Sequence, residues 1–234
     1  MSRQRAFFVT GTDTEVGKTF VTTALLQAAR QQGLTTLAIK PVAAGCEETP
    51  EGLRNEDALA LQQAMTARLN YAEVNPIALR APIAPHIAAR YERVELSASR
   101  LSDHCRQLMQ ADVDLVLIEG AGGWRVPLNE RENLSDLPKT LKLPVILVVD
   151  MRLGCLNHAL LTAEAIERDG LQLAGWVANQ VHPQPMPELG ANLETLALRL
   201  QAPRLGIIPH MQISAVGGAV DAAACLDLAP LLRD

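Results

Sequence analysis

Short apolar runs alternate with segments of helical periodicity along most of the chain. The strand-like runs lie at 7–9, 36–39, 113–118, 145–149, 173–177 and 205–208. Helices are expected at 18–32, 55–67, 98–110, 157–168, 187–201 and 222–232. This alternation predicts an α/β fold with a mostly parallel, doubly wound sheet, which binds ligands at the carboxyl ends of its strands.

Helix boundaries and one irregular segment can also be proposed from single residues. Asn55 and Asn157 precede helical patterns and are interpreted as N-caps, whereas Gly33 and Gly170 are interpreted as C-terminal stops. The proline-rich segment 74–90 is expected to be an irregular excursion.

Two of the expected strands, 113–118 and 145–149, are apolar on both faces, as in a sheet with helices on either side. The 234 residues are enough for one large α/β domain, and two small domains are the alternative. Because 48% of the residues are hydrophobic but only 3% are aromatic, the core must consist mainly of Ala, Leu, Val and Ile.

The segment AFFVTGTDTEVGKT near the N-terminus has the order strand, loop, helix. Backbone N–H groups of such a loop and the positive end of the next helix cradle phosphate oxygens. Lys18 is expected to reach the outer phosphates and Thr19 to ligate Mg²⁺. The spacing is one residue longer than usual, since Gly11 lies six positions before Gly17 and Thr12 stands at the expected glycine. A chance GKT in a surface turn is the alternative, and the flanking pattern favours nucleotide binding.

Two further polar residues follow the second strand. Lys40 stands at the strand end, and Pro41 and Gly45 prevent regular structure after it. From position alone, Lys40 is either a cation for a phosphoryl group or anionic substrate, or a solvated lysine. Asp57 lies near a helix start, where it either favours the first turn or binds Mg²⁺, and Glu56 competes with it.

The strands at 113–118 and 145–149 also lead into polar loops. Glu119 ends the first of them and is followed by Gly-Ala-Gly-Gly-Trp. It is either a carboxylate that organises magnesium, as P-loop enzymes place at such a strand end, or part of a plain turn. Asp114, at the opposite end of that strand, is expected to point away. After the second strand, free N–H groups near Asn157 are expected either to hold a carboxylate or only to be capped.

Charge and composition exclude several classes of protein. The net charge is −5 and no basic run is present, which argues against a nucleic-acid surface. No apolar stretch reaches about 18 residues, and the N-terminus does not have the pattern of a signal peptide. The four cysteines are scattered without CxxC spacing, so free thiols and a reducing cytoplasm are expected.

An ordered set of segments closely resembles the dethiobiotin synthetase family. A phosphate loop alone fits many functions, whereas this set is far more specific and covers most of 6–210, with gaps at 84–112 and 183–202. The segments are GTDTEVGKT (11–19), KPVAAG (40–45), TPEGLRNEDAL (49–59), VNPIAL (74–79), EGAGGW (119–124), LPVILVV (143–149), LGCLNHALLTAEAI (153–166) and GWVANQV (175–181).

The resemblance implies a single P-loop α/β synthetase domain over residues 1–234. Members of the family use ATP, Mg²⁺ and CO₂ (or bicarbonate) to close a ureido ring on 7,8-diaminopelargonate in biotin biosynthesis. The substrate forms a carbamate and then a carbamic–phosphoric anhydride before the ring closes. The resemblance also implies a homodimer with shared active sites.

The resemblance further implies particular contacts. Lys18 and Lys40 would hold the γ-phosphate and the carbamate, with Thr14 and Glu15 beside the reacting groups. The Mg²⁺ ligands would be Thr19, Asp57 and Glu119. The nucleotide contacts would be Glu15, Val16, Gly17, Lys18, Thr19, Phe20, Asp57, Glu119, Gly120, Ala121, Gly122, Asn179, Gln180 and Pro209, among which Asn179 reads adenine. The substrate contacts would be Lys40, Ala44, Gly154, Cys155 and Asn157, and the turn at 154–157 would act across the dimer interface.

Two residues depart from the family pattern. Ala44 replaces a common serine, which removes a hydrogen bond to the substrate. Asp150 replaces a common glycine, where its charge either repels an anionic substrate or faces solvent. A related ligase acting on another diamine is therefore one alternative. A partitioning or positioning ATPase of the MinD or ParA kind is another, and an amidoligase would need a glutaminase domain that the chain has no room for.

Overall fold

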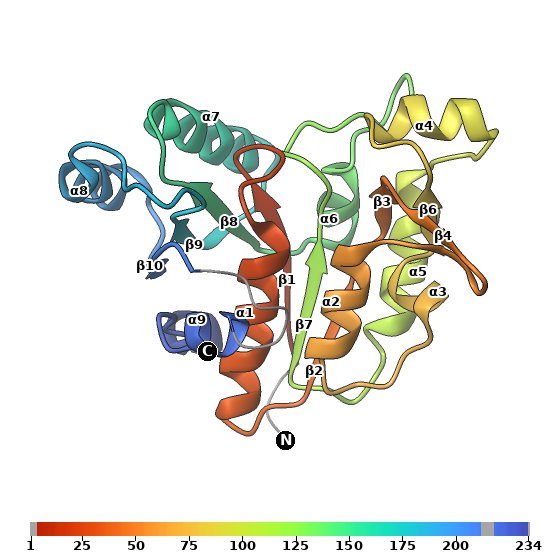
Figure 1. The fold of residues 1–234 in the computed structure, drawn as a ribbon, viewed down its shortest axis with the longest axis horizontal. Coiled ribbons are helices and arrows are strands. Elements are labelled where there is room, and N and C mark those ends of the chain that lie inside the picture. The colour runs from red at the N-terminus through yellow and green to blue at the C-terminus, as the bar shows by residue number, and fades with distance from the viewer. Residues whose placement is uncertain (1–3, 212–217, 234) are drawn as a thin grey trace.

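Six parallel strands form the central sheet of the computed structural model, which describes residues 4–211 and 218–233 (Figure 1). The strand order is β10-β9-β8-β1-β7-β2. The strands are β1 Arg5–Gly11, β2 Thr36–Ile39, β7 Leu115–Glu119, β8 Val145–Asp150, β9 Leu173–Asn179 and β10 Arg204–Ile208. All six strands expected from the sequence are present, and the expected parallel α/β sheet is confirmed.

Helices cover both faces of this sheet (Figure 1). On one face lie α1 Lys18–Gln31, α2 Glu56–Ala64, α3 Tyr71–Val74, α9 Gly218–Ala223 and α10 Ala229–Leu232. On the other lie α4 Pro85–Glu92, α5 Ala98–Leu108, α6 Asp136–Leu141, α7 Cys155–Arg168 and α8 Leu189–Arg199. Strands β7 and β8 are buried at every position, which explains why their sequences are apolar throughout. Among the described residues, no helix has both the length and the apolar character needed to span a membrane.

The segment 74–90 is more regular than expected. Its β6 strand, Ile77–Leu79, pairs in parallel with β3, Val42–Ala44, and helix α4 begins at Pro85. Proline is well accommodated in the first turn of a helix, where its missing N–H has no intrahelical partner. A hairpin of β4 Glu47–Thr49 and β5 Gly52–Arg54 was likewise not expected.

Two helix predictions need correction. The expected helix 222–232 is divided into α9 and α10, because Leu226 between them forms a bridge to Gly206 of β10. Asn157 is not an N-cap: helix α7 begins at Cys155, with Gly154 (φ 95°) at the N-cap and no side-chain cap.

The other boundary residues behave as predicted. The Asn55 side chain accepts a hydrogen bond from the Ala58 N–H at 3.3 Å and caps α2. Gly33 and Gly170 both have φ of 78°, the left-handed conformation that ends a helix.

The loop that follows β7 at the carboxyl edge of the sheet is held by Asp169, which lies outside that edge. Trp124 packs edge-on against Phe8 of β1, with ring centroids 6.0 Å apart, and its indole N–H donates to Asp169 Oδ2 at 2.9 Å. Arg125 donates to both Asp169 oxygens, at 2.6 and 2.9 Å. Burial raises the pKa of Asp169, but Arg125 and Trp124 outweigh it and hold that pKa below its usual range. Asp169 therefore holds the loop after β7 in place.

Asp169→Asn should lower the free energy of unfolding by about 1–2 kcal/mol at pH 7, because the Arg125 pair is half-exposed and contributes modestly. The native pKa is depressed, so the stabilisation is present above the unfolded pKa of about 3.9 and is lost as pH falls through the lower native value. Urea unfolding at several pH values should show the two proteins converging in acid. Asp103→Asn, in an exposed ion pair on α5, is the control. An Asp169→Asn deficit that does not shrink in acid would contradict the charged anchor.

Candidate active site

The residues predicted to carry chemistry gather at the carboxyl edge of the sheet. The phosphate loop follows β1, Lys40 follows β2, Glu119 ends β7 and Asp150 ends β8. In a doubly wound sheet this edge, where the connections change direction, is the usual ligand crevice. The strand order therefore assembles one site from segments more than 100 residues apart.

The phosphate loop depends on a glycine immediately before α1. Gly17 has φ of 82° and is the N-cap of α1. A Cβ at Gly17 would lie only 2.2 Å from Nδ2 of Asn179, so a larger residue would displace that side chain. No acidic residue lies in the first turn of α1, and its N–H groups are available to an anion.

Lys18 lies over the loop that precedes it. Its ammonium donates to the Asp13 carbonyl at 3.0 Å, and the residue is buried. Burial, helped by the nearby charge of Lys40, lowers the pKa of Lys18 to about 8 despite the opposing effect of Glu119. An anionic ligand at this loop would therefore stabilise the charged form of Lys18.

Lys40 and Glu119 form a buried ion pair. Lys40 Nζ lies 2.6 Å from Glu119 Oε1 and 2.8 Å from Asp57 Oδ2, while Lys40 is 3% exposed and Glu119 0%. Burial lowers the pKa of Lys40, but the two carboxylates outweigh it, so that the pKa is raised. Burial likewise raises the pKa of Asp57, and Lys40 outweighs it and holds that pKa low. The interpretation of Lys40 as a solvated lysine is wrong.

Thr19 joins this cluster from the phosphate loop. Its hydroxyl donates to Glu119 Oε1 at 2.7 Å, whereas the buried Glu119 Oε2 has no hydrogen-bond partner. The structure thus brings Thr19, Asp57 and Glu119 together around one ammonium group. In the described part of the chain, no three His, Cys, Asp or Glu side chains could hold a metal ion. A hydroxyl, two carboxylates and ligand oxygens are nevertheless a donor set that suits Mg²⁺, and the unpartnered Oε2 fits it.

The glycine-rich loop after Glu119 packs against the phosphate loop. Gly122 has φ of 62°, and a Cβ there would lie 3.5 Å from Thr14 Oγ1. A Cβ at Gly123 would lie 3.6 Å from the Gly11 carbonyl. Gly120 and Ala121 connect this contact to Glu119, so the two loops form one continuous surface, on which Thr14 and Glu15 are exposed.

The predicted adenine-side residues follow β9 and β10. Asn179 is buried, and its Nδ2 donates to the Val16 carbonyl of the phosphate loop at 2.9 Å. The Gln180 N–H donates to the Ile208 carbonyl at 2.9 Å, next to the exposed Pro209. Asn179 therefore supports the phosphate loop directly, a contact that the sequence did not indicate.

The predicted substrate residues divide into two groups. Ala44 lies in β3, half-buried, on the Lys40 side. Gly154 and Asn157 are exposed at the start of α7, beside the buried Cys155. Among the described residues, no hydrogen bond or ion pair joins the turn at 154–157 to Lys40 or Ala44.

Of the two alternatives expected for Asp150, the solvent-facing one is wrong, and repulsion of an anionic substrate stays a prediction. Asp150 is 5% exposed and therefore does not face solvent, and its Oδ2 lies 3.3 Å from Nε of Arg152. Arg152 also pairs with Asp13 of the phosphate loop at 3.2 Å. Sequence reasoning missed both Arg152 and Asp13, and the only available signal was the i, i+2 spacing of Asp150 and Arg152.

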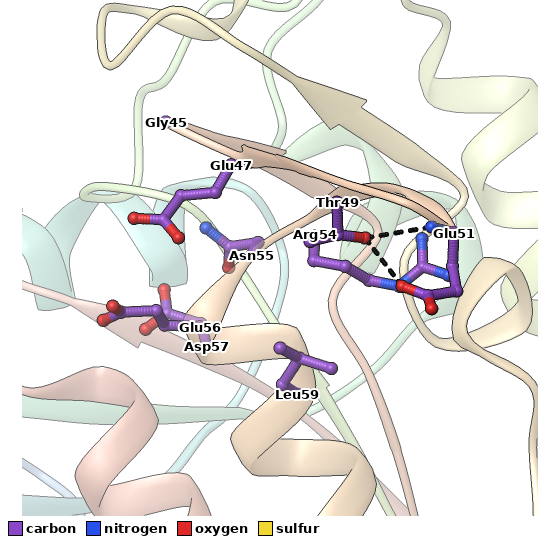
Figure 2. Close-up of a pocket in the computed structure, with 9 residues that line it drawn as sticks. All are labelled: Gly45, Glu47, Thr49, Glu51, Arg54, Asn55, Glu56, Asp57 and Leu59. Carbon is purple, nitrogen blue, oxygen red and sulfur yellow. Dashed lines mark hydrogen bonds between the residues drawn. The ribbon is translucent and has the colours of Figure 1, made fainter.

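A cavity of about 430 Å³ opens beside Asp57, between the β4–β5 hairpin and the start of α2 (Figure 2). The carboxylates of Glu47, Glu56 and Asp57 gather at one end of it, and Thr49 and Glu51 lie at the other (Figure 2). The end nearest Lys40 is therefore strongly acidic.

Comparison with known proteins identifies close relatives. A family model described as an AAA domain matches residues 5–215. The chain is 57% identical over 229 residues to the ATP-dependent dethiobiotin synthetase BioD of Cellvibrio japonicus, covering 98% of each chain. It is 60% identical over 226 residues to the protein of the same name from Pseudomonas aeruginosa (strain UCBPP-PA14), covering 97% of each.

Solved structures support the fold. The septum site-determining protein MinD from Pyrococcus horikoshii, in complex with Mg-ADP, has a TM-score of 0.58 and 17% identity, over 94% of this chain and 86% of that one. Chloroplast FtsY from Physcomitrella patens has a TM-score of 0.52 and 20% identity, over 95% of this chain and 66% of that one. At such identities only the P-loop fold is shared, so the likeness to MinD does not favour the positioning-ATPase alternative.

Lys40→Met should lower the free energy of unfolding by about 3 kcal/mol at pH 7, because it leaves the buried Glu119 carboxylate without its cation. The measurement is urea unfolding in the absence of metal and nucleotide. Glu119→Gln added to Lys40→Met should recover most of the loss, since a neutral amide replaces the unpaired charge. Lys139→Met, which removes a half-exposed ion pair on α6, should change stability by less than about 1 kcal/mol. A fully stable Lys40→Met variant would show that the pair is dispensable.

Proposed function

The chain belongs to the family of ATP-dependent dethiobiotin synthetases, and from that premise we propose how its carboxyl-edge site performs the reaction. It is an ATP-dependent ligase of biotin biosynthesis. The observation that supports the assignment of the reacting centre is the buried pair of Lys40 and Glu119, which the half-exposed Asp57 and Thr19 join beside the phosphate loop. Phosphoryl transfer depends mainly on positioning and charge neutralisation, which this cluster provides.

The reaction proposed here closes a ureido ring on 7,8-diaminopelargonate. One amine captures CO₂ as a carbamate, and a carbamate oxygen attacks the γ-phosphorus while the bond to ADP breaks. The second amine then attacks the carbonyl carbon of the mixed anhydride, inorganic phosphate leaves, and the ring closes. Protons released from the two amines pass to solvent or to nearby carboxylates.

The phosphate loop binds the triphosphate of ATP. The free N–H groups at the start of α1 and the ammonium of Lys18 face the phosphate oxygens, and residues 15–20 surround them. On the adenine side, Asn179 Nδ2 donates to the Val16 carbonyl. The Oδ1 atom of Asn179 is therefore the one that accepts from the exocyclic amine of adenine. Gln180 and Pro209 border the base.

Thr19, Asp57 and Glu119 would hold Mg²⁺, and Gly120, Ala121 and Gly122 would lie along the phosphates. When bound, the metal would neutralise charge that develops during phosphoryl transfer. The residues fit it because the Glu119 Oε2 atom is buried without a partner and Thr19 already contacts the same carboxylate. With Asp57 and Glu119 serving as metal ligands, the Lys40 ammonium would be available to the carbamate.

The substrate lies between Lys40 and the acidic cavity of Figure 2. Lys40 holds the carbamate, while Thr14 and Glu15 of the exposed phosphate loop lie beside the reacting groups. The carboxylates of Glu47, Glu56 and Asp57 provide a negative field that favours a diamine. Ala44 offers no side-chain hydrogen bond, so only backbone groups around it can hydrogen-bond to the substrate there.

The turn at 154–157 binds the substrate carboxylate, and it does so across a homodimer interface. Leu153 beside this turn is 91% exposed and Leu161 on α7 is 56% exposed, an apolar surface that a second copy would cover. The exposed Gly154 and Asn157 lie on the same surface. We place the enzyme in the cytoplasm, because its four cysteines are free thiols.

Phosphate release from MgATP and bicarbonate should require 7,8-diaminopelargonate and should yield a product with the mass of dethiobiotin. Lys18→Ala should lower turnover by about 10²-fold or more, as for the loss of one preorganised charge contact. Lys139→Ala, at a half-exposed lysine of α6, is the matched control and should retain normal turnover. Equal phosphate release without the diamine, and no product, would refute the proposed reaction.

Glu119→Gln should raise the Mg²⁺ concentration needed for half-maximal turnover by about tenfold or more, because it removes a charged ligand. Binding of Mn²⁺ in the presence of a non-hydrolysable ATP analogue, followed by electron paramagnetic resonance, gives a readout independent of turnover. Glu56→Gln, at the exposed carboxylate beside Asp57, should leave the binding of Mn²⁺ unchanged. If Glu56→Gln weakens metal binding and Glu119→Gln does not, the ligand assignment is wrong.

A further inference from the structure

Asp150 is a buried carboxylate to which the proposed reaction gives no task. Its Oδ1 has no hydrogen-bond partner, and its Oδ2 faces Nε of Arg152 at 3.3 Å and the exposed His182, whose Nε2 lies 3.9 Å away. Burying a carboxylate that is only partly paired costs free energy. We propose that Asp150 is a positioning residue that fixes the phosphate loop through Arg152 and Asp13.

The connection from Asp150 to the loop has three steps. Asp150 holds the Arg152 guanidinium, whose NH2 group donates to Asp13 Oδ2 at 3.2 Å. The other oxygen of Asp13 accepts from the Thr14 N–H at 2.8 Å, and its carbonyl accepts from Lys18 Nζ at 3.0 Å. Asp13 is therefore held at its side chain while its carbonyl holds the phosphate-binding lysine.

The neighbouring strand holds the second half of the same loop. Asp150 is paired with Asn179 in the β8–β9 register, and the Met151 N–H donates to the Asn179 carbonyl at 2.9 Å. The Asn179 side chain donates to the Val16 carbonyl. Two adjacent strand ends thus fix both halves of the loop, Asp150 acting at Asp13 and Asn179 acting at Val16.

A positioning role of Asp150 and simple charge repulsion by Asp150 predict opposite effects of its removal on the affinity for ATP. A buried negative charge near a triphosphate weakens its binding by repulsion, so its removal alone would tighten the binding of ATP. If Asp150 instead keeps Arg152 on Asp13, its removal releases Arg152 and loosens the loop that holds Lys18. The inference rests on the proposed binding of MgATP at this loop.

The test is the dissociation constant of Mg²⁺ with a non-hydrolysable ATP analogue, measured by isothermal titration calorimetry. Asp150→Asn and Arg152→Gln should each weaken binding by about fivefold, as expected for a partly exposed charged contact. The double variant should be no weaker than either single variant, because both act through Asp13. The Michaelis constant for the diamine should stay within about twofold. Arg152→Gln changes a half-exposed side chain and serves as a second probe if Asp150→Asn folds poorly.

Asp103→Asn removes one negative charge from an exposed ion pair on α5, which packs on the opposite face of the sheet from α1. It should leave nucleotide affinity unchanged. Tighter binding by Asp150→Asn, unchanged affinity, or additive losses in the double variant would each overturn the inference. Failure of the unmodified protein to bind the analogue would instead reject the proposed nucleotide site.

Discussion

The buried contact between Lys40 and Glu119 is the interaction on which the site depends. Ile39 of β2 pairs with Ile118 of β7, so the next residue of each strand, Lys40 and Glu119, meets at the sheet edge. A fully buried carboxylate is tolerated there because a cation lies 2.6 Å away. Strand pairing, rather than any loop, therefore sets the position of these two charges. On its other side β7 pairs with β1, where Glu119 lies opposite Val9, next to the phosphate loop.

The phosphate loop is held by contacts from neighbouring segments in addition to its own hydrogen bonds at Asp13. Gly17 allows the sharp entry into α1 and leaves room for Asn179, whose amide reaches Val16. The glycine-rich loop after Glu119 closes over the other side, where Asp169 holds it through Trp124. Neighbouring strand ends thus fix the loop on several sides, which suits a reaction that depends on positioning.

Much of the fold and the central chemistry could be predicted from the sequence, because both depend on local patterns. The six strands follow from apolar runs, and the positions of Lys40 and Glu119 follow from the rule that ligands bind at the carboxyl ends of parallel strands. The start of α7 could not be placed, because Gly154 and Asn157 are both acceptable caps and only backbone geometry decides between them. The environment of Asp150 could not be predicted either, since the Arg152 side chain beside it contacts Asp13, which lies 139 residues away in the sequence.

The charges of the cluster bear on the proposed binding of Mg²⁺ together with the nucleotide. Lys18 and Lys40 balance Asp57 and Glu119, so the four side chains are together close to neutral. Lys18, Lys40 and Glu119 are buried, and Asp57 is half-exposed. A divalent metal alone would add positive charge beside two ammonium groups, and a triphosphate alone would add negative charge beside two carboxylates. A divalent metal bound together with the triphosphate would offset part of its charge, so the pair would disturb the charge balance of the site less than the triphosphate alone. The burial that makes the ion pair costly would thus also favour the proposed magnesium–nucleotide complex.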